Sequence, residues 1–198
     1  MKIALVPMAA KPYHAGHDGL VRIASNENDK VQLFVSTSDR ARRGEIKISG
    51  SVMEEIWRRY IEPTLPSNVT LIYGGVPVSE VYKTLENAEM EGSPDTFVIY
   101  SDDVDILKYT DEKLRKSAPT LFSNGQIERR GISRSETVQV SGTEMRKFIE
   151  DNDIVAFVAL LPPSIQKHGR EIFNMLQDEI VGEAVLRRYV KTLLENKI

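Results

Sequence analysis

Short apolar runs alternate with helix-like patterns along the first half of the chain. The run from Ile3 to Val6 is unbroken and is bounded by Pro7, which is typical of a short buried strand. Runs rich in Val, Leu, Ile, Phe and Tyr predict further strands at Lys30–Thr37, Asn68–Gly74 and Thr96–Ser101. The chain is therefore expected to contain at least these strands, each separated from the next by a longer segment.

Helices are predicted in the segments between these strands. The first has apolar residues at helical spacing, namely Leu20, Val21, Ile23 and Ala24. The second begins at Ser51, which is followed by Glu54 as in a capping box, and ends before Pro63. The third is capped by Ser79 and extends to about Met90.

Strands that alternate with helices predict a parallel sheet with helices on both faces, a Rossmann-like, doubly wound α/β fold. Thr120–Ser135 is expected to form a fifth, less regular strand and a loop. Residues 1–162 are expected to form this domain. Residues 163–198, after Pro162-Pro163, are expected to form a C-terminal helical extension packed on it. The alternative is that the apolar stripe of the extension is an interface for homo-oligomers.

Composition narrows the class of protein. The chain has 198 residues, of which 41% are hydrophobic and 28% charged, as in a globular domain. The net charge of −3 provides no overall field for nucleic acid or an anionic membrane. The absence of cysteine excludes disulfides, thiolate metal sites and a cysteine nucleophile. Neither a signal-peptide pattern nor an apolar run of about 20 residues is present, so we expect a cytoplasmic protein.

Several chemically suggestive segments follow the predicted strands. In an open parallel sheet, ligands bind beyond the carboxyl ends of the strands, where the strand order reverses. The segments at these ends are the His14–His17 turn, the Arg40–Arg43 loop, the Gly74-Gly75 turn and Asp102. This convergence predicts a binding site at that edge of the sheet.

The turn after the first strand contains His14 and His17, three residues apart, with Gly16 between them. At the start of a helix, free amide groups and the positive end of the helix dipole favour a phosphate. Gly16 would let an anion approach the backbone, and the imidazoles would donate hydrogen bonds to it. The alternative is that one or both histidines only cap or line the turn.

A second helix start lies at Ser141, where Glu144 completes a capping-box pattern. A purely structural cap is one interpretation. However, Arg146 follows within about one turn, where a cation opposes the helix dipole. A bound anion would relieve that opposition, and Ser141 and Thr143 could bind the same anion.

Three sequence motifs together resemble the HxGH-type nucleotidylyltransferase superfamily. His14-Ala15-Gly16-His17 resembles its first signature, and Val140–Arg146 resembles its second, with Val140 in place of Ile and Gly142 in place of Ser. Tyr100-Ser101-Asp102 resembles the Gly-Ser/Ala-Asp turn of the adenylyltransferase branch, with Tyr100 in place of Gly. The resemblance covers about Lys2 to Pro162 and looks most like phage-encoded members of unassigned substrate, which would work in the host cytoplasm.

This resemblance implies transfer of a nucleoside monophosphate from a nucleoside triphosphate to a phosphorylated small molecule, with release of pyrophosphate. ATP is favoured over CTP because of Ser101-Asp102, and Mg²⁺ would be carried with the triphosphate rather than by protein metal ligands. The implied catalytic residues are His14, His17 and Arg146. The implied nucleotide-binding residues are Met8, Ala9, Lys11, Gly16, Arg40, Arg42, Asp102, Ser141, Gly142 and Thr143. Lys11 stands where the family often has Asp or Gln.

Other interpretations of the same residues remain open. Asp102 could cap a segment that begins at Val104, and the Arg40–Arg43 cluster could be a solvated loop. A class I aminoacyl-tRNA synthetase would need a Lys-Met-Ser-Lys-Ser type loop, which this chain lacks. The main alternative function is a non-catalytic nucleotide-binding or assembly protein, including a virion-associated one, that uses the C-terminal helix as its interface.

Overall fold

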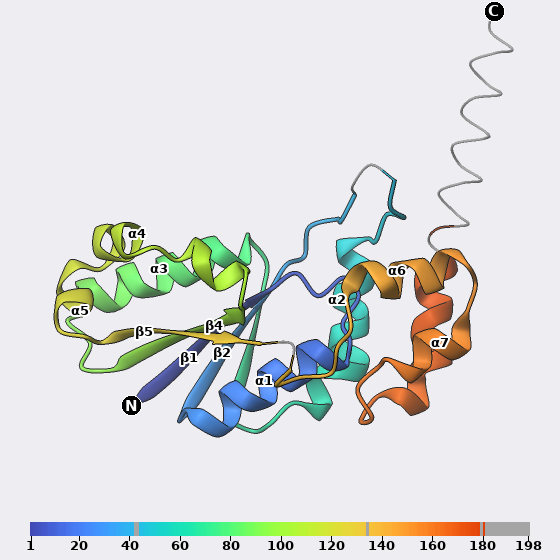
Figure 1. The fold of residues 1–198 in the computed structure, drawn as a ribbon, viewed down its shortest axis with the longest axis horizontal. Coiled ribbons are helices and arrows are strands. Elements are labelled where there is room, and N and C mark those ends of the chain that lie inside the picture. The colour runs from blue at the N-terminus through green and yellow to red at the C-terminus, as the bar shows by residue number, and fades with distance from the viewer. Residues whose placement is uncertain (42–43, 134, 179, 181–198) are drawn as a thin grey trace, which may run out of the picture.

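The computed structural model describes residues 1–41, 44–133, 135–178 and 180. Its centre is a five-stranded, all-parallel sheet with the strand order β3-β2-β1-β4-β5 (Figure 1). The strands are β1 (Lys2–Met8), β2 (Lys30–Val35), β3 (Val69–Tyr73), β4 (Thr96–Asp102) and β5 (Ile127–Ile132). The order reverses between β1 and β4. This arrangement confirms the predicted Rossmann-like α/β fold.

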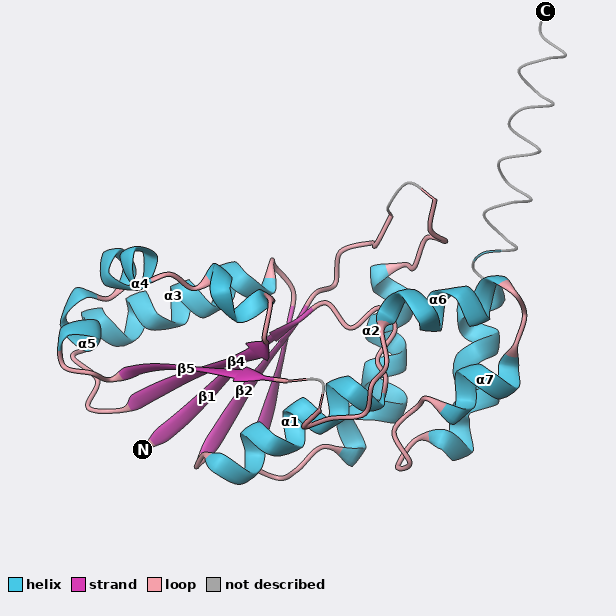
Figure 2. Cartoon of the chain, viewed as in Figure 1, coloured by secondary structure: helices cyan, strands magenta, loops and turns pink. Residues whose placement is uncertain are grey.

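Helices cover both faces of this sheet, as Figures 1 and 2 show. On one face, Ile3 and Leu5 of β1 belong to an apolar cluster that includes α3 (Pro77–Met90), α4 (Asp111–Ser117) and α5 (Pro119–Ser123). On the other face, Ala4 and Val6 cluster with α1 (Ala15–Glu27). Alternate residues of β1 belong to the two clusters because successive side chains of a strand point to opposite faces of the sheet.

A second group of helices extends the α1 face beyond the sheet. It consists of α2 (Gly50–Ile56), which continues through a π-helical turn (Trp57–Ile61) and a 3₁₀ turn (Glu62–Thr64), then α6 (Gly142–Glu150), α7 (Ile154–Ala159) and a 3₁₀ turn (Gln166–His168). Residues 169–178 are helical. Trp57 is fully buried, and Ile172, Phe173 and Leu176 lie in the same core cluster. The described part of the predicted extension therefore packs on the sheet domain.

The rest of the predicted apolar stripe, from Val181 to Leu194, lies outside the described residues, as does any interface that it forms. The division at residue 162 and the predicted homo-oligomer stay predictions. His168 is partly exposed, and its Nδ1 lies 3.7 Å from Glu171 Oε2.

Several predicted boundaries were wrong. Pro7 does not end the first strand but continues it, opposite Phe34 and beyond the last β1–β4 pair, where a proline is tolerated. The third helix is not capped by Ser79. It begins with Pro77, whose fixed φ suits the first helical position.

The second helix begins earlier than predicted. Its cap is Ser49, whose Oγ accepts a hydrogen bond from the Val52 amide (3.4 Å), and Ser51 Oγ instead bonds Ser49 Oγ (2.7 Å). Gly50 explains the shift, because a Cβ there would lie 1.7 Å from the Thr37 carbonyl oxygen. That close approach holds the start of α2 against Thr37, at the beginning of the loop that follows β2.

No helix or strand was predicted between β4 and Thr120. In the structure, this region contains a 3₁₀ turn (Asp105–Lys108), α4 and the first residue of α5. Of the strand and loop predicted at Thr120–Ser135, Ile127–Ile132 is extended, whereas the first residues are helical and belong to α5. Short helices of five to seven residues carry too little periodicity to be recognised in a sequence.

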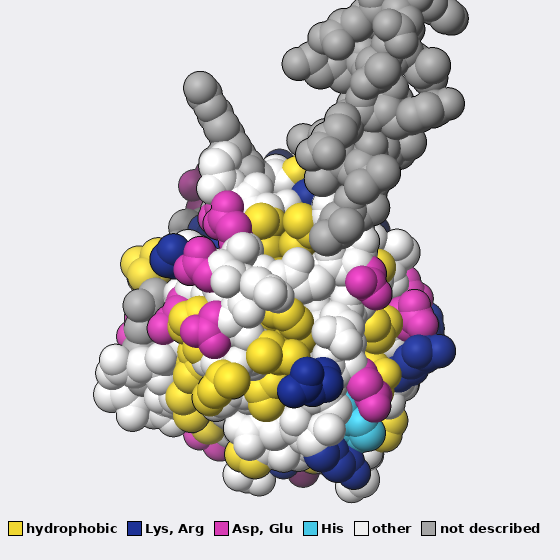
Figure 3. Space-filling model, turned by 90° about the vertical axis from the view of Figure 1, so that its right-hand side faces the viewer, with side chains coloured by type: hydrophobic (Ala, Val, Ile, Leu, Met, Phe, Trp, Pro, Cys, Tyr) yellow, Lys and Arg dark blue, Asp and Glu magenta, His cyan; other side chains and the backbone are white. Residues whose placement is uncertain are grey.

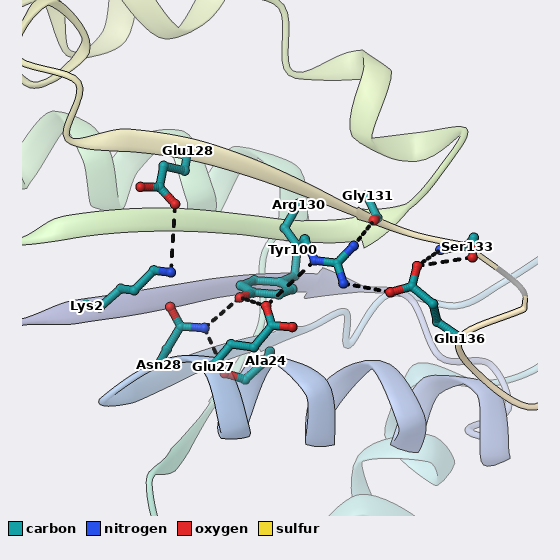
Figure 4. Close-up of polar contacts among 10 residues, drawn as sticks. All are labelled: Lys2, Ala24, Glu27, Asn28, Tyr100, Glu128, Arg130, Gly131, Ser133 and Glu136. Carbon is teal, nitrogen blue, oxygen red and sulfur yellow. Dashed lines mark hydrogen bonds and ion pairs between the residues drawn. The ribbon is translucent and has the colours of Figure 1, made fainter.

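A polar network that is buried at Asn28 and Tyr100 and exposed at Glu27 and Glu136 joins α1 to β4 and β5 (Figure 4). The Tyr100 hydroxyl donates to Glu27 (2.8 Å) and accepts from Asn28 Nδ2 (2.8 Å), while Arg130 lies 3.7 Å from Glu27 and 2.6 Å from Glu136. Burial raises the pKa of Tyr100 to about 12, so the hydroxyl stays protonated. Tyr100 thus has a structural role. It stands where the Gly-Ser/Ala-Asp turn of the adenylyltransferase branch has Gly.

No helix among the described residues combines the length and the apolar character needed to cross a membrane. Figure 3 shows the α6–α7 side of the molecule, where hydrophobic side chains gather near the centre of the face with acidic and basic side chains around them. Val155 of α7 is exposed (77%).

Candidate functional site

A cavity of about 290 Å³ lies at the carboxyl ends of β1, β4 and β5. Met8, Asp102 and Ile132, the last residues of these three strands, line it. The cavity is therefore at the point where the strand order reverses, which is the usual ligand position in open α/β sheets. The starts of α1 and α6 complete the wall through Gly16 and Gly142.

His14 and His17 both line this cavity, and their rings stack with centroids 3.7 Å apart. His14 is the N-cap of α1, and its Nδ1 accepts a hydrogen bond from the His17 amide (3.4 Å). That bond places the remaining proton of a neutral His14 on Nε2. Tyr13 stacks on His17, with ring centroids 5.8 Å apart, and packs against Trp57. The rings are therefore held by packing.

Both histidines are uncharged near neutral pH. Burial lowers the pKa of His14 to about 4, and the charge of Arg146 acts in the same direction. Burial, with a contribution from His14, lowers the pKa of His17 well below its ordinary value. The buried Nδ1 of His17 has no hydrogen-bond partner among the described residues. A buried polar atom of this kind normally finds a partner, which favours a ligand in the adjoining cavity.

The amides at the start of α1 are less available than the sequence predicts. The Ala15 amide donates to the Leu160 carbonyl (2.9 Å), and the His17 amide is used by His14. A Cβ at Gly16 would lie 2.9 Å from the Val138 carbonyl oxygen and 3.2 Å from His14 Cε1. Close packing of the protein itself therefore already requires Gly16, and the approach of an anion there stays a prediction.

The start of α6 combines a cap with an arginine, as predicted. Ser141 Oγ accepts from the Glu144 amide (3.1 Å) and caps the helix. Arg146 is buried (4% exposed) and donates to the Lys11 carbonyl (2.9 Å) and to Thr143 Oγ1 (2.9 Å). A Cβ at Gly142, which lines the cavity, would lie 3.1 Å from Arg146 Nη1. The guanidinium therefore lies just behind the cavity wall.

Glu45 joins two of the predicted phosphate-binding residues. Its Oε1 lies 3.1 Å from Arg146 Nη2, and its Oε2 accepts from Arg40 Nη2 (3.0 Å) and Nε (3.2 Å). Desolvation of the Glu45 carboxyl raises its pKa, but the hydrogen bonds and charges of both arginines outweigh this and hold that pKa below its usual range. In this structure Arg40 and Arg146 face a carboxylate of the protein itself.

Lys11 is buried (4% exposed), and its Nζ has no hydrogen-bond partner among the described residues. Burial lowers its pKa, Asp39 raises it and Arg40 lowers it. The charges that act on its side chain are thus those of Asp39 and Arg40, while the backbone carbonyl of Lys11 accepts a hydrogen bond from Arg146.

Asp102 is both a cap and a cavity residue. Its Oδ1 accepts from the amides of Val104 (2.9 Å) and Asp105 (2.7 Å), as the alternative interpretation expected. The same residue lines the cavity, next to Ser101 and Asp105. The two interpretations of Asp102 are compatible, since Oδ1 alone makes both bonds.

The structure brings most of the predicted site residues to one place. Those that line the cavity are Met8, Ala9, His14, Gly16, His17, Asp102, Ser141 and Gly142. Lys11, Arg40, Thr143 and Arg146 do not line it, and the last three are engaged by side-chain hydrogen bonds. Arg42 lies outside the described residues. The predicted Gly74-Gly75 turn follows β3, beyond β2 from β1, and does not line the cavity.

Comparison with known proteins gives a distant likeness in fold. A scan against protein-family models finds no match, and a search of curated proteins finds none either. Among solved structures, the chain is similar to Thermotoga maritima TmcAL bound with alpha-thio ATP, with a TM-score of 0.48 and 16% sequence identity. That match covers 92% of this chain and 56% of TmcAL, so the chain spans just over half the length of that protein.

Sequence reasoning missed several cavity residues. The lining residues that were not named as nucleotide-binding are Ala10, Leu20, Ser101, Asp105, Ile132, Thr137, Val138 and Val140. Of these, Ser101 and Val140 belong to the motifs noted in the sequence. Ser101 and Asp105 flank the predicted Asp102, so their proximity was a usable signal. Thr137 and Val138 lie in an irregular segment with no periodicity, and nothing in the sequence indicates that it returns to α1.

Proposed function

We propose that this protein is a nucleotidylyltransferase. It transfers a nucleoside monophosphate, with AMP favoured over CMP, from a nucleoside triphosphate to a phosphorylated small molecule and releases pyrophosphate. The observation that carries the proposal is that the His14–His17 turn and the Ser141-Gly142 helix start, far apart in sequence, line one cavity at the strand-order reversal. The buried and unpartnered Nδ1 of His17 supports the same assignment.

In the proposed reaction, a phosphate oxygen of the acceptor forms a bond to the α-phosphorus. The bond from that phosphorus to the bridging oxygen breaks, and the electron pair leaves with pyrophosphate. The acceptor phosphate is ionised at neutral pH, so no general base is needed. His14, with its proton on Nε2, and His17 would donate hydrogen bonds to phosphate oxygens as their charge rises. Catalysis is then positioning and electrostatics, as in phosphoryl transfer generally.

Mg²⁺ enters this proposal as part of the triphosphate substrate. No group of three or more His, Cys, Asp or Glu side chains suited to a metal occurs in the described part of the chain. The carboxylates of Asp102 and Asp105 line the cavity and are oxygen donors of the kind that Mg²⁺ accepts beside phosphate oxygens. The ion would neutralise charge on the phosphates.

Pyrophosphate release tests the proposal directly. The full chain is mixed with Mg²⁺, each nucleoside triphosphate and a panel of acceptors that includes nicotinamide mononucleotide, phosphopantetheine and sugar or alcohol phosphates. We expect release that needs both substrates and is fastest with ATP. His17→Ala should lower kcat by about 10²–10³, as for loss of one preorganised donor. His168→Ala is the matched control, because His168 lies in a 3₁₀ turn far along the chain and does not line the cavity. Equal turnover in the two variants would remove His17 from the mechanism.

A non-catalytic nucleotide-binding protein is the second candidate. The specific observation in its favour is the ion pair of Arg146 with Glu45, which engages the guanidinium that transfer would need. Binding of triphosphates without pyrophosphate release, across the whole acceptor panel, would favour this candidate over the enzyme.

A further inference from the structure

The surroundings of Glu45 suggest a role that the proposed function leaves unassigned. Glu45 uses both carboxylate oxygens, one for Arg146 and the other for Arg40. Two oxygens shared between two guanidinium groups are also what a phosphate group presents to arginines. The carboxylate therefore occupies the position, relative to these cations, that a bound phosphate would take.

This anion position adjoins the cavity. Gly142 lines the cavity, and the point where its Cβ would lie is 3.1 Å from Arg146 Nη1. Because glycine has no side chain, residue 142 places no side chain between the cavity edge and the guanidinium. A chain of phosphates that starts beside His14 could therefore extend past Gly142 to Arg146.

The local charges favour an anion larger than one carboxylate. Lys11 adds a third cation, and its buried Nζ has no hydrogen-bond partner among the described residues. Asp39, the other acid nearby, is already engaged by Lys47 (3.1 Å) and by the Gly50 amide (2.9 Å). A single Glu45 carboxylate thus pairs with two guanidinium groups, and an anion with more charge would satisfy them better.

We propose that Glu45 is a built-in competitor for the triphosphate tail. Its carboxylate occupies Arg40 and Arg146 when no nucleotide is bound, is displaced by the β- and γ-phosphates on binding, and returns as pyrophosphate leaves. Glu45 thereby weakens triphosphate binding and favours release of the product. This inference rests on the proposed function, because it assumes that a polyphosphate reaches these arginines.

The opposite role for Glu45 would be to position Arg146 for the ligand. The two roles predict opposite signs for the same substitution. If Glu45 competes, its removal tightens polyphosphate binding, since the apparent affinity of a ligand falls by the fraction of protein in which its site is available. If Glu45 positions Arg146, its removal weakens binding.

The experiment is isothermal titration calorimetry of the full chain with inorganic pyrophosphate, ATP and AMP. We expect Glu45→Gln to bind pyrophosphate and ATP about tenfold more tightly than the parent chain, as when a site available in a tenth of the molecules becomes fully available. AMP has no β- or γ-phosphate, so its affinity should stay the same. The matched control is Glu54→Gln, which breaks the exposed Glu54–Arg58 pair (2.7 Å) on α2.

Each outcome decides the question. Unchanged or weaker pyrophosphate binding in Glu45→Gln overturns the inference, as does an equal gain in Glu54→Gln. If Glu45→Gln does not fold, Glu45→Asp replaces it, and its shorter side chain should still give part of the gain. Tighter pyrophosphate binding without any transfer activity keeps the inference and rejects the transferase. Transfer activity together with unaltered pyrophosphate binding in the variants rejects the inference about Glu45 and keeps the transferase. If no chain binds pyrophosphate or ATP, both fall.

Discussion

The buried histidines should make the stability of this protein depend on pH between about 6.5 and 4. In the unfolded chain a histidine has a pKa near 6.5, whereas burial and Arg146 lower the pKa of His14 in the folded protein to about 4. The unfolded state then binds the proton more tightly. The contribution of His14 to the free energy of unfolding is therefore fully present above pH 6.5 and is lost as the pH falls towards 4.

The magnitude follows from these two values. For a single group with a pKa of about 6.5 unfolded and about 4 folded, the free energy of unfolding at pH 5 is lower than at pH 7.5 by ~2 kcal/mol. The largest possible loss, below pH 4, is ~3 kcal/mol. His17 lies in the same stack and its pKa is also lowered, so it adds to the loss of stability at low pH.

Urea denaturation at pH 7.5 and pH 5 measures this loss. His14→Gln has lower stability at both values because it lacks the cap, but its change between the two should be smaller than that of the parent chain by ~2 kcal/mol. Saturating tripolyphosphate should reduce the loss in the parent chain, since an adjacent anion raises the pKa of both histidines. An identical pH dependence in the parent chain and His14→Gln would refute the reasoning.

Two further predictions concern packing and the cavity carboxylate. Gly50→Ala should destabilise the protein by ~2–3 kcal/mol or more in urea denaturation, because its Cβ would lie 1.7 Å from the Thr37 carbonyl oxygen. The control is Gly19→Ala, whose Cβ meets the Thr137 side chain at 3.0 Å. It should cost less than ~1 kcal/mol. Equal losses would contradict this. Asp102→Asn keeps an Oδ1 acceptor for the Val104 and Asp105 amides, so stability should change by less than ~0.5 kcal/mol while calorimetry shows weaker binding of ATP with Mg²⁺. Normal binding with a large loss of stability would leave Asp102 only its capping role.

The fold was predictable because its strands are short apolar runs with clear ends. The parallel sheet followed from the alternation of strands and helices, and the position of His14 and Asp102 followed from where their strands end. Those inferences need only local periodicity and a general property of α/β sheets.

The parts that were not predictable depend on contacts distant in sequence. Ser49 rather than Ser51 caps α2 because Gly50 packs on Thr37, which no capping pattern reveals. Glu45 meets Arg146 across 101 positions, so the arginine predicted to be available for phosphate is ion-paired in this structure. Burial of Lys11 is of the same kind, since the charges that act on its pKa are those of Asp39 and Arg40 in the loop after β2.

The hydrogen bond from the Ala15 amide to the Leu160 carbonyl has a consequence for the order of assembly. All five strands of the sheet precede residue 133. During synthesis, the residues of the sheet are therefore complete before Leu160 is added to the chain. At that stage the histidine turn still lacks the carbonyl that holds its first helical amide. The turn therefore reaches its final geometry only after synthesis has passed α7.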